Sequence, residues 1–137
     1  MKRMNPSSHG IVALIRNERG EYLLLKDSRE PMLGHWAPPH GRCKASDTSE
    51  EQAVMREVLE ETGLTVKPLK KIATQAADTK VKTVSFWLVQ AESTDNIRLN
   101  EESSAYGWYD TASLLRLELY PGTRSFFERP PKRLPLI

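Results

Sequence analysis

The stretch REVLEETGL, residues 56–64, decides the fold of this chain. A helix start precedes it, because Thr48 and Glu51 have the spacing of a capping box, and Gly63 suits the position just after a helix end. We therefore expect a helix over residues 49–62, and its last two turns carry three glutamates. Acidic side chains are unfavourable there, since the helix dipole is negative at that end and neighbouring glutamates repel one another.

The two sides of this predicted helix differ in chemistry. At 100° per residue, an apolar side contains Val54, Met55, Val58 and Leu59, and an acidic side contains Glu50, Glu57, Glu60 and Glu61. Solvation of the acidic side is one interpretation. A bound cation is the other, because only Arg56 lies near the patch in the sequence. Magnesium suits such a patch, since it prefers oxygen ligands and leaves positions for substrate phosphates, whereas His9, His35 and His40 lack the helical spacing of zinc ligands.

Strand patterns flank the helix on both sides. Residues 9–27 read as two strands joined by a polar turn at 17–20, and we expect them to form a hairpin. Residues 28–46 are rich in Pro and Gly and predict a long functional loop that contains a short strand at 36–37. After the helix come three predicted strands within 64–77, 82–92 and 104–110, short helices within 111–119 (capped by Asp110 or Thr111) and 121–129, and a proline-rich, extended or frayed tail over 130–137. This order predicts an α+β fold with a mixed sheet.

Composition narrows the class of protein. The 137 residues fit one domain, residues 1–137, with 39% apolar and 28% charged residues and a net charge of +2. So small a net charge disfavours a dedicated binder of duplex DNA. One cysteine, Cys43, excludes an internal disulfide, and the apolar run at 11–15 is too short for a signal peptide. We expect a cytoplasmic protein without a membrane span.

The sequence REVLEETGL resembles the second half of the Nudix box, whose pattern is GX5EX7REUXEEXGU with U an aliphatic residue. The positions that match are Arg56, Glu57, Val58, Glu60, Glu61, Gly63 and Leu64. The first half departs from the pattern. Counted from Gly41, Asp47 stands where the first Glu is expected, and eight residues instead of seven separate it from Arg56. In the family that Glu pairs with the box Arg, so Asp47, Glu50 or Glu51 would substitute here.

The resemblance implies a Nudix-type α/β/α sandwich with a central mixed sheet, and a hydrolase that acts on phosphoric anhydride bonds. It implies Mg²⁺, with Mn²⁺ as a substitute, held by Glu57, Glu60, Glu61 and the carbonyl of Gly41. The catalytic set would be Glu57, Glu60, Arg56 and Glu102. Arg56 would orient the carboxylates, and the general base would be Glu57 or an acidic residue of a later loop, where we prefer Glu102 over Glu101.

Three segments, residues 34–41, 82–92 and 97–110, resemble the asymmetric diadenosine tetraphosphate hydrolases of this family. The resemblance implies cleavage of a nucleoside polyphosphate, such as diadenosine tetraphosphate to ATP and AMP, by in-line attack of water. The expected substrate contacts are His40, Phe86, Tyr106 and Trp108. Aromatic rings among them would stack on a purine, with core packing as the alternative role. Relatives carry Lys at the position of His40.

Two other functions stay open at this point. The first is a pyrophosphohydrolase for nucleoside triphosphates or RNA 5′ ends, and a basic surface for RNA would draw on Lys67, Lys70, Lys71, Lys80 and Lys82. The second is a non-catalytic nucleotide-binding module, suggested by the irregular first half of the box. The self-repelling glutamates argue against it. The sequence leaves monomer and homodimer equally open.

Overall fold

The computed structural model describes residues 8–77, 81–132 and 134. The strands are β1 (His9–Ile15), β2 (Tyr22–Asp27), β3 (Trp36–Ala37), β4 (His40–Arg42), β5 (Val66–Ala76), β6 (Thr83–Ala91) and β7 (Ser103–Tyr109). The helices are α1 (Glu50–Thr62), α2 (Thr111–Leu114) and α3 (Pro121–Glu128). The predicted strands and helices are present, and β4 is an additional short strand within the loop predicted over 28–46.

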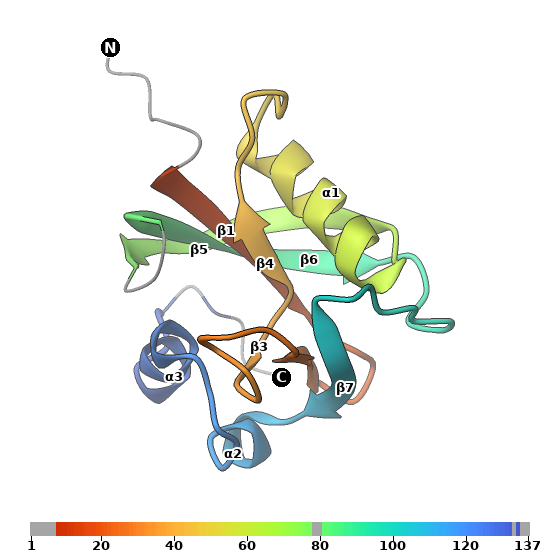
Figure 1. Ribbon diagram of the computed structural model, residues 1–137, viewed down its shortest axis with the longest axis vertical. Coiled ribbons are helices and arrows are strands. Elements are labelled where there is room, and N and C mark those ends of the chain that lie inside the picture. Colours follow the sequence, from red (N-terminus) through yellow and green to blue (C-terminus); the bar gives the residue numbers. More distant parts are fainter. Residues whose placement is uncertain (1–7, 78–80, 133, 135–137) are drawn as a thin grey trace.

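The strands form two sheets that lie between the helices (Figure 1). One sheet has the order β4-β1-β6-β5 and the other has the order β3-β2-β7. The β1–β6 pair is parallel and the other pairs are antiparallel, so the first sheet is mixed as predicted. Helix α1 lies on one side of the sheets, and α2 and α3 lie on the other (Figure 1). The architecture is the α/β/α sandwich that the sequence predicts.

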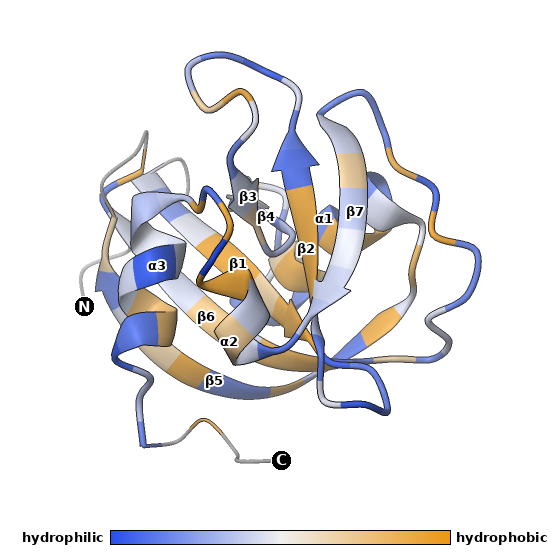
Figure 2. Cartoon of the chain, turned by 90° about the horizontal axis from the view of Figure 1, so that it is seen from below, coloured by the Kyte–Doolittle hydropathy of each residue, from blue (hydrophilic) through white to orange (hydrophobic). Residues whose placement is uncertain are grey.

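Burial on both faces of β1 explains why this strand is apolar throughout. Ile11, Ala13 and Ile15 belong to the core cluster that packs beneath α1, whereas Val12 and Leu14 belong to the cluster shared with α2 and α3. Successive side chains of a strand point to opposite faces, so a strand between two helical layers needs an unbroken apolar run. Figure 2 shows this apolar character along β1 and β2, with hydrophilic colour in the loops at the edges of the molecule.

The predicted hairpin between the first two strands is wrong. Strand β1 pairs with β4 and β6, whereas β2 pairs with β3 and β7, and only an isolated Arg16–Tyr22 bridge joins the two. The polar turn itself forms where predicted, with Gly20 at φ 77°. A turn of this kind fixes a change of direction but not the partner of each strand, so here it carries the chain from one sheet to the other.

Helix α1 has the predicted length, but the side that it buries is not the predicted one. Its N-cap is Ser49, whose side chain accepts from the Gln52 amide, and not Thr48 as the capping-box spacing suggested. Gly63 ends the helix at φ 75° as expected. The buried residues are Ala53, Val54, Glu57, Val58, Glu61 and Thr62. Met55 and Leu59 are exposed, so their predicted burial is wrong, because two of the glutamates take the inward positions instead.

Helices α2 and α3 begin as predicted. Asp110 caps α2, and Pro121 opens α3. Of the predicted proline-rich tail, residues 133 and 135–137 lie outside the described part, as does Lys80. Within residues 8–77, 81–132 and 134, no helix is long and apolar enough to cross a membrane.

Candidate active site

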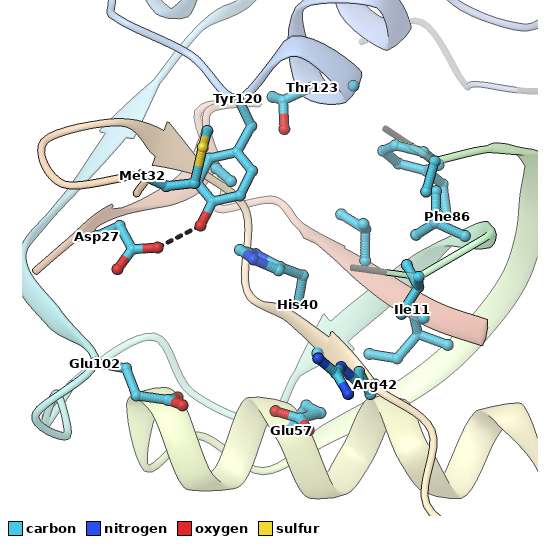
Figure 3. A pocket seen from close by; sticks show the side chains of 18 of the residues that line it. Ile11, Asp27, Met32, His40, Arg42, Glu57, Phe86, Glu102, Tyr120 and Thr123 are labelled. Carbon is cyan, nitrogen blue, oxygen red and sulfur yellow. Dashed lines mark hydrogen bonds between the residues drawn. The ribbon is translucent and has the colours of Figure 1, made fainter. Parts of the chain in front are cut away.

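A cavity of about 620 Å³ lies between α1 and the start of α3 (Figure 3). Residues from both sheets line it, and Glu57 and Glu102 stand at one end while Thr123 stands at the other (Figure 3). Its size suits a small-molecule ligand, since such sites commonly enclose several hundred Å³.

Two of the box glutamates are buried beside this cavity. Burial raises the pKa of Glu61 well above its ordinary value, and the negative charges of Glu57 and Glu102 raise it further. Burial also raises the pKa of Glu57, against the opposing influence of Arg56. The Oε2 atom of Glu61 makes no hydrogen bond to any residue that the structure describes. A buried carboxylate oxygen without a partner is costly, and a hydrogen-bond donor or a cation would satisfy it.

Gly41 gives the Glu57 carboxylate its space. A Cβ atom on Gly41 would lie 2.2 Å from the carboxyl carbon of Glu57 and 2.4 Å from each of its oxygens. Any side chain at this position would therefore displace the carboxylate. The sequence analysis expected Gly41 to offer its carbonyl to a metal, and that role stays a prediction.

Arg56 holds the loop before α1 against the helix. Its Nε and Nη2 atoms donate to the two oxygens of Asp47 at 2.9 and 2.8 Å, and its Nη1 donates to Glu57 at 2.9 Å. Of the three acids considered for the first box position, Asp47 is the one that pairs with Arg56. The hydrogen bonds from Arg56 lower the pKa of Asp47 despite burial. The irregular spacing thus preserves the bidentate ion pair.

Glu60 differs from the other two box glutamates. Its side chain is 46% exposed and accepts from Arg56 Nη1 at 3.3 Å. In the part of the chain that the structure describes, no group of three or more His, Cys, Asp or Glu side chains is arranged to hold a metal ion. What the structure offers a cation is the buried pair Glu57 and Glu61. Two carboxylates suit Mg²⁺, which completes its shell with water and phosphate oxygens.

Glu102 belongs to a chain of polar contacts that runs along the cavity. Arg29 Nη1 donates to Glu102 at 2.9 Å, and Arg29 Nε donates to Asp27 at 3.3 Å. The Tyr120 hydroxyl donates to the other oxygen of Asp27 (Figure 3). Burial acts to raise the pKa of Asp27, but the hydrogen bonds from Tyr120 and Arg29 outweigh it and hold that pKa below its ordinary value.

Sequence reasoning missed Asp27, Arg29 and Tyr120. The available signal was the sharp change at the end of the apolar run LLL, where β2 turns hydrophilic (Figure 2). An acid that closes a buried strand often sits at a cavity. Its partner Tyr120 lies 93 residues away, just before α3, and nothing in the sequence connects the two residues.

The predicted substrate contacts divide into two pairs. His40 and Phe86 line the cavity. Phe86 also stacks on Phe126, with ring centroids 4.2 Å apart. Tyr106 and Trp108 are not among the described residues that line it. Tyr106 is exposed, and Trp108 packs against the core cluster beneath α1.

Comparison with known proteins gives consistent matches. The NUDIX domain model matches residues 6–129. The asymmetrical bis(5′-nucleosyl)-tetraphosphatase of Caenorhabditis elegans is 29% identical over 106 residues, which are 73% of this chain and 75% of that protein. The crystal structure of a MutT protein from Methanosarcina mazei Go1 has a TM-score of 0.75 and 32% identity, covering 93% of this chain and 95% of that one. A binary complex of the C. elegans Ap4A hydrolase has a TM-score of 0.73 and 26% identity, covering 88% and 93%.

Proposed function

The chain belongs to the NUDIX family and is a hydrolase of phosphoric anhydride bonds, and from this premise we propose that it is a magnesium-dependent enzyme that cleaves dinucleoside tetraphosphates asymmetrically. The substrate class is supported by the likeness to the C. elegans tetraphosphatase. Diadenosine tetraphosphate would yield ATP and AMP.

The observation that carries the proposal is a pair of buried carboxyl groups: Glu57 lines one end of the cavity, and Glu61 lies against it with its Oε2 atom unpartnered among the described residues. The protein destabilises itself locally by burying these carboxylates side by side. Glu57 and Glu61 would hold a divalent cation, which would offset that penalty and would supply positive charge for the diphosphate and for activation of water.

Each neighbouring residue has a proposed task. Glu57 and Glu61 would hold the cation, Gly41 leaves room for Glu57, and Arg56 fixes Glu57 in place. Glu102 would accept the proton of the attacking water, and it reaches the cavity edge with one oxygen held by Arg29. The cavity walls would position the nucleotide for in-line attack and exclude competing water.

The test is a turnover assay with excess Mg²⁺ on diadenosine tetraphosphate, ADP-ribose, ordinary and oxidised nucleoside triphosphates, and triphosphorylated RNA. Product nucleotides are separated by ion-exchange chromatography. We expect ATP and AMP from diadenosine tetraphosphate, and we expect a loss of at least about 10³-fold in Glu61→Gln. Glu51→Gln is the matched control, because Glu51 is an exposed glutamate in the first turn of the same helix.

Each result has a distinct meaning. Cleavage of another substrate in the panel would retain the chemistry and reject the dinucleoside tetraphosphate. Nucleotide binding without turnover of any substrate would reject the enzyme in favour of a binding module. Equal turnover by the wild type and Glu61→Gln would contradict the proposal that Glu61 holds a cation.

A further inference from the structure

The segment that follows β2 is tied to the segment that precedes β7. The Ser28 amide donates to the Glu102 carbonyl at 3.0 Å, and the Ser28 hydroxyl donates to the Glu101 carbonyl at 2.6 Å. Just before these contacts, the β2–β7 ladder shifts register between Lys26 and Asp27. Irregularities of this kind re-aim side chains beside active sites. The contacts of Ser28 fix the main chain at Glu101 and Glu102 but leave the direction of the Glu102 side chain open.

Side chains set the direction of the Glu102 carboxylate, which stands near Glu57 at one end of the cavity (Figure 3). Arg29 Nη1 donates to Glu102 Oε1 at 2.9 Å. Asn100 Nδ2 approaches Oε2 at 3.4 Å, which is longer than a usual N–H···O hydrogen bond. A hydrogen bond between two charged groups is also the stronger kind. Arg29 is therefore the residue that orients this carboxylate most firmly.

A buried acid holds Arg29 in turn. Asp27 Oδ1 accepts from the Arg29 amide at 2.9 Å and from Arg29 Nε at 3.3 Å. Asp27 is buried, and its Oδ2 accepts from the Tyr120 hydroxyl (Figure 3). A planar guanidinium that is held at Nε presents its Nη1 protons from a defined position. Asp27 is thus an anchor in the interior for an arginine that reaches to the cavity edge.

The ion pair between Arg29 and Glu102 has little to contribute to the stability of the fold. The two side chains are 54% and 34% exposed. Pairs this exposed are weak, because water solvates both charges and salt screens them. An exposed arginine on a buried anchor is better explained by the direction that it gives to the carboxylate.

We propose that Arg29 is a positioning residue, which holds the Glu102 carboxylate in the orientation that takes the proton of the attacking water, and that Asp27 with Tyr120 holds Arg29. The water oxygen bonds to phosphorus, its proton passes to Glu102, and the bond from that phosphorus to the bridging oxygen breaks, with the electron pair leaving on the departing nucleotide. The inference rests on the proposed hydrolase and adds the residue that makes its base effective.

A double-mutant cycle tests whether Arg29 acts through Glu102. Steady-state kinetics compare wild type, Arg29→Ala, Glu102→Gln and the double variant on the substrate that the wild type cleaves. We expect Arg29→Ala to lower kcat by about 10–100-fold and to change KM less than about twofold. In the Glu102→Gln background the same change should lower kcat less than about twofold, since no carboxylate base remains to be positioned. Equal losses in both backgrounds, or a loss confined to KM, would overturn the proposal and assign Arg29 to substrate binding.

Rescue experiments separate positioning from a structural role. Added guanidinium, at concentrations far below those that unfold the protein, should restore part of the kcat of Arg29→Ala and none of that of Glu102→Gln. Arg29→Lys keeps the charge without the fork and should fall between wild type and Arg29→Ala. Arg19→Ala is the matched control, because Arg19 is an exposed arginine that does not line the cavity, and its kcat should be unchanged. The melting temperature of Arg29→Ala should stay within about 2 °C of wild type. A larger fall without guanidinium rescue would make Arg29 structural.

The mobility of the Glu102 side chain keeps this proposal separable from the proposed function, because its measurement requires no turnover. NMR relaxation of the Glu102 Cγ methylene gives an order parameter in the metal-free protein. We expect it to fall by about half in Arg29→Ala and to stay unchanged in Arg19→Ala. An unchanged order parameter in Arg29→Ala would overturn the positioning role whatever the kinetics show. A fall in a chain that turns over no substrate would reject the hydrolase and retain Arg29 as the residue that holds Glu102.

Discussion

At the scale of the residue, the arrangement of the site depends on two details: the lack of a Cβ atom at Gly41 and an oxygen of Glu61 without a partner in the described part of the chain. Gly41 has no Cβ atom, and the carboxylate of Glu57 occupies the space that a Cβ would fill. Glu61 contributes an oxygen that finds no partner among the described residues. Both are packing facts about atoms from β4 and α1, which lie against each other in the fold. A single added methyl group at Gly41 would therefore move the Glu57 carboxylate.

Gly41→Ala is expected to reduce kcat/KM by about 10²-fold or more, because the new methyl group would occupy the position of the Glu57 carboxylate. Steady-state kinetics with saturating Mg²⁺ measure the loss. A double-mutant cycle with Glu57→Ala identifies its cause. The cycle is measured on the unfolding free energy. In the Glu57→Ala background the carboxylate that clashes with the new methyl group is gone, so Gly41→Ala should lower the unfolding free energy less than it does in the wild type. If Gly41→Ala lowers the unfolding free energy equally in both backgrounds, the destabilisation comes from another contact of β4.

Glu61→Gln is expected to raise the metal-free melting temperature by about 2–5 °C. The folded pKa of Glu61 is raised, so its protonated form is favoured in the fold. The stability that this gives is present below the ordinary pKa of 4.5 and is lost as the pH rises through the folded value. The variant and wild type should therefore melt together near pH 4 and diverge above it. Thermal scans in EDTA across pH 4–8 test this, and a variant that melts lower at pH 8 would contradict it.

Much of this scale was predictable. The sequence placed the three glutamates together at the end of one helix, and it named Asp47 as one of three acids that could pair with Arg56. The contact between Tyr120 and Asp27 did not, because those residues belong to segments that meet only once β2 and α3 are placed in space. The partner of Arg56 shows the same limit of the sequence. Three acids had plausible spacing, and only the path of the loop brings Asp47 to Arg56.

At the scale of the element, α1 shows why a helical wheel can identify the wrong face. The wheel placed Met55 and Leu59 inside, yet they are the exposed apolar residues of α1, and Glu57 and Glu61 are buried. The 100° rule locates the apolar sector but assumes that the core alone decides the orientation. Here the cavity also borders the helix, and the buried stripe is rotated toward it.

Asp47→Asn is expected to lower the unfolding free energy by about 2–3 kcal/mol at pH 7, because it breaks a mostly buried bidentate pair with Arg56. The pKa of Asp47 is lowered in the fold from its ordinary value of 3.8. Its contribution is thus present above pH 3.8 and is lost as the pH falls through the lower folded value. Urea titrations at pH 7 and pH 3 measure the difference, which should shrink at pH 3. An equal difference at both pH values would show that charge is not the cause.

At the scale of the whole molecule, polar contacts along the cavity join the ends of β2 and β7, which belong to one sheet, to the segment that precedes α3. Asp27 ends β2, Arg29 follows it, Glu102 precedes β7, and Tyr120 precedes α3. Three segments of the chain thus meet through three side-chain contacts. The order of elements predicted an α+β fold with a mixed sheet, and the resemblance to the Nudix family implied the α/β/α layers. The wrong hairpin shows that this order does not reveal which strands are neighbours.

Asp27→Asn is expected to lower kcat/KM about tenfold and to increase amide hydrogen exchange in residues 28–36 and 118–123, because the charged link between Arg29 and Tyr120 is lost. Hydrogen exchange followed by mass spectrometry locates the change. Asp95→Asn serves as the comparison, since Asp95 is exposed and does not line the cavity. Unchanged exchange in both segments would limit Asp27 to a local role.

The contact between Trp87 and α1 gives the molecule an intrinsic optical reporter. The indole Nε1 donates to Glu50 at 3.0 Å, in the first turn of the helix that carries the proposed metal-binding carboxylates, and Lys71 lies over the same ring at 5.6 Å from its centroid. Indole emission responds to nearby charge, so any shift of α1 relative to β6 changes the colour and yield of that fluorescence. With Trp36 and Trp108 replaced by phenylalanine, the arrival of a cation at the other end of α1 becomes visible in real time without a label.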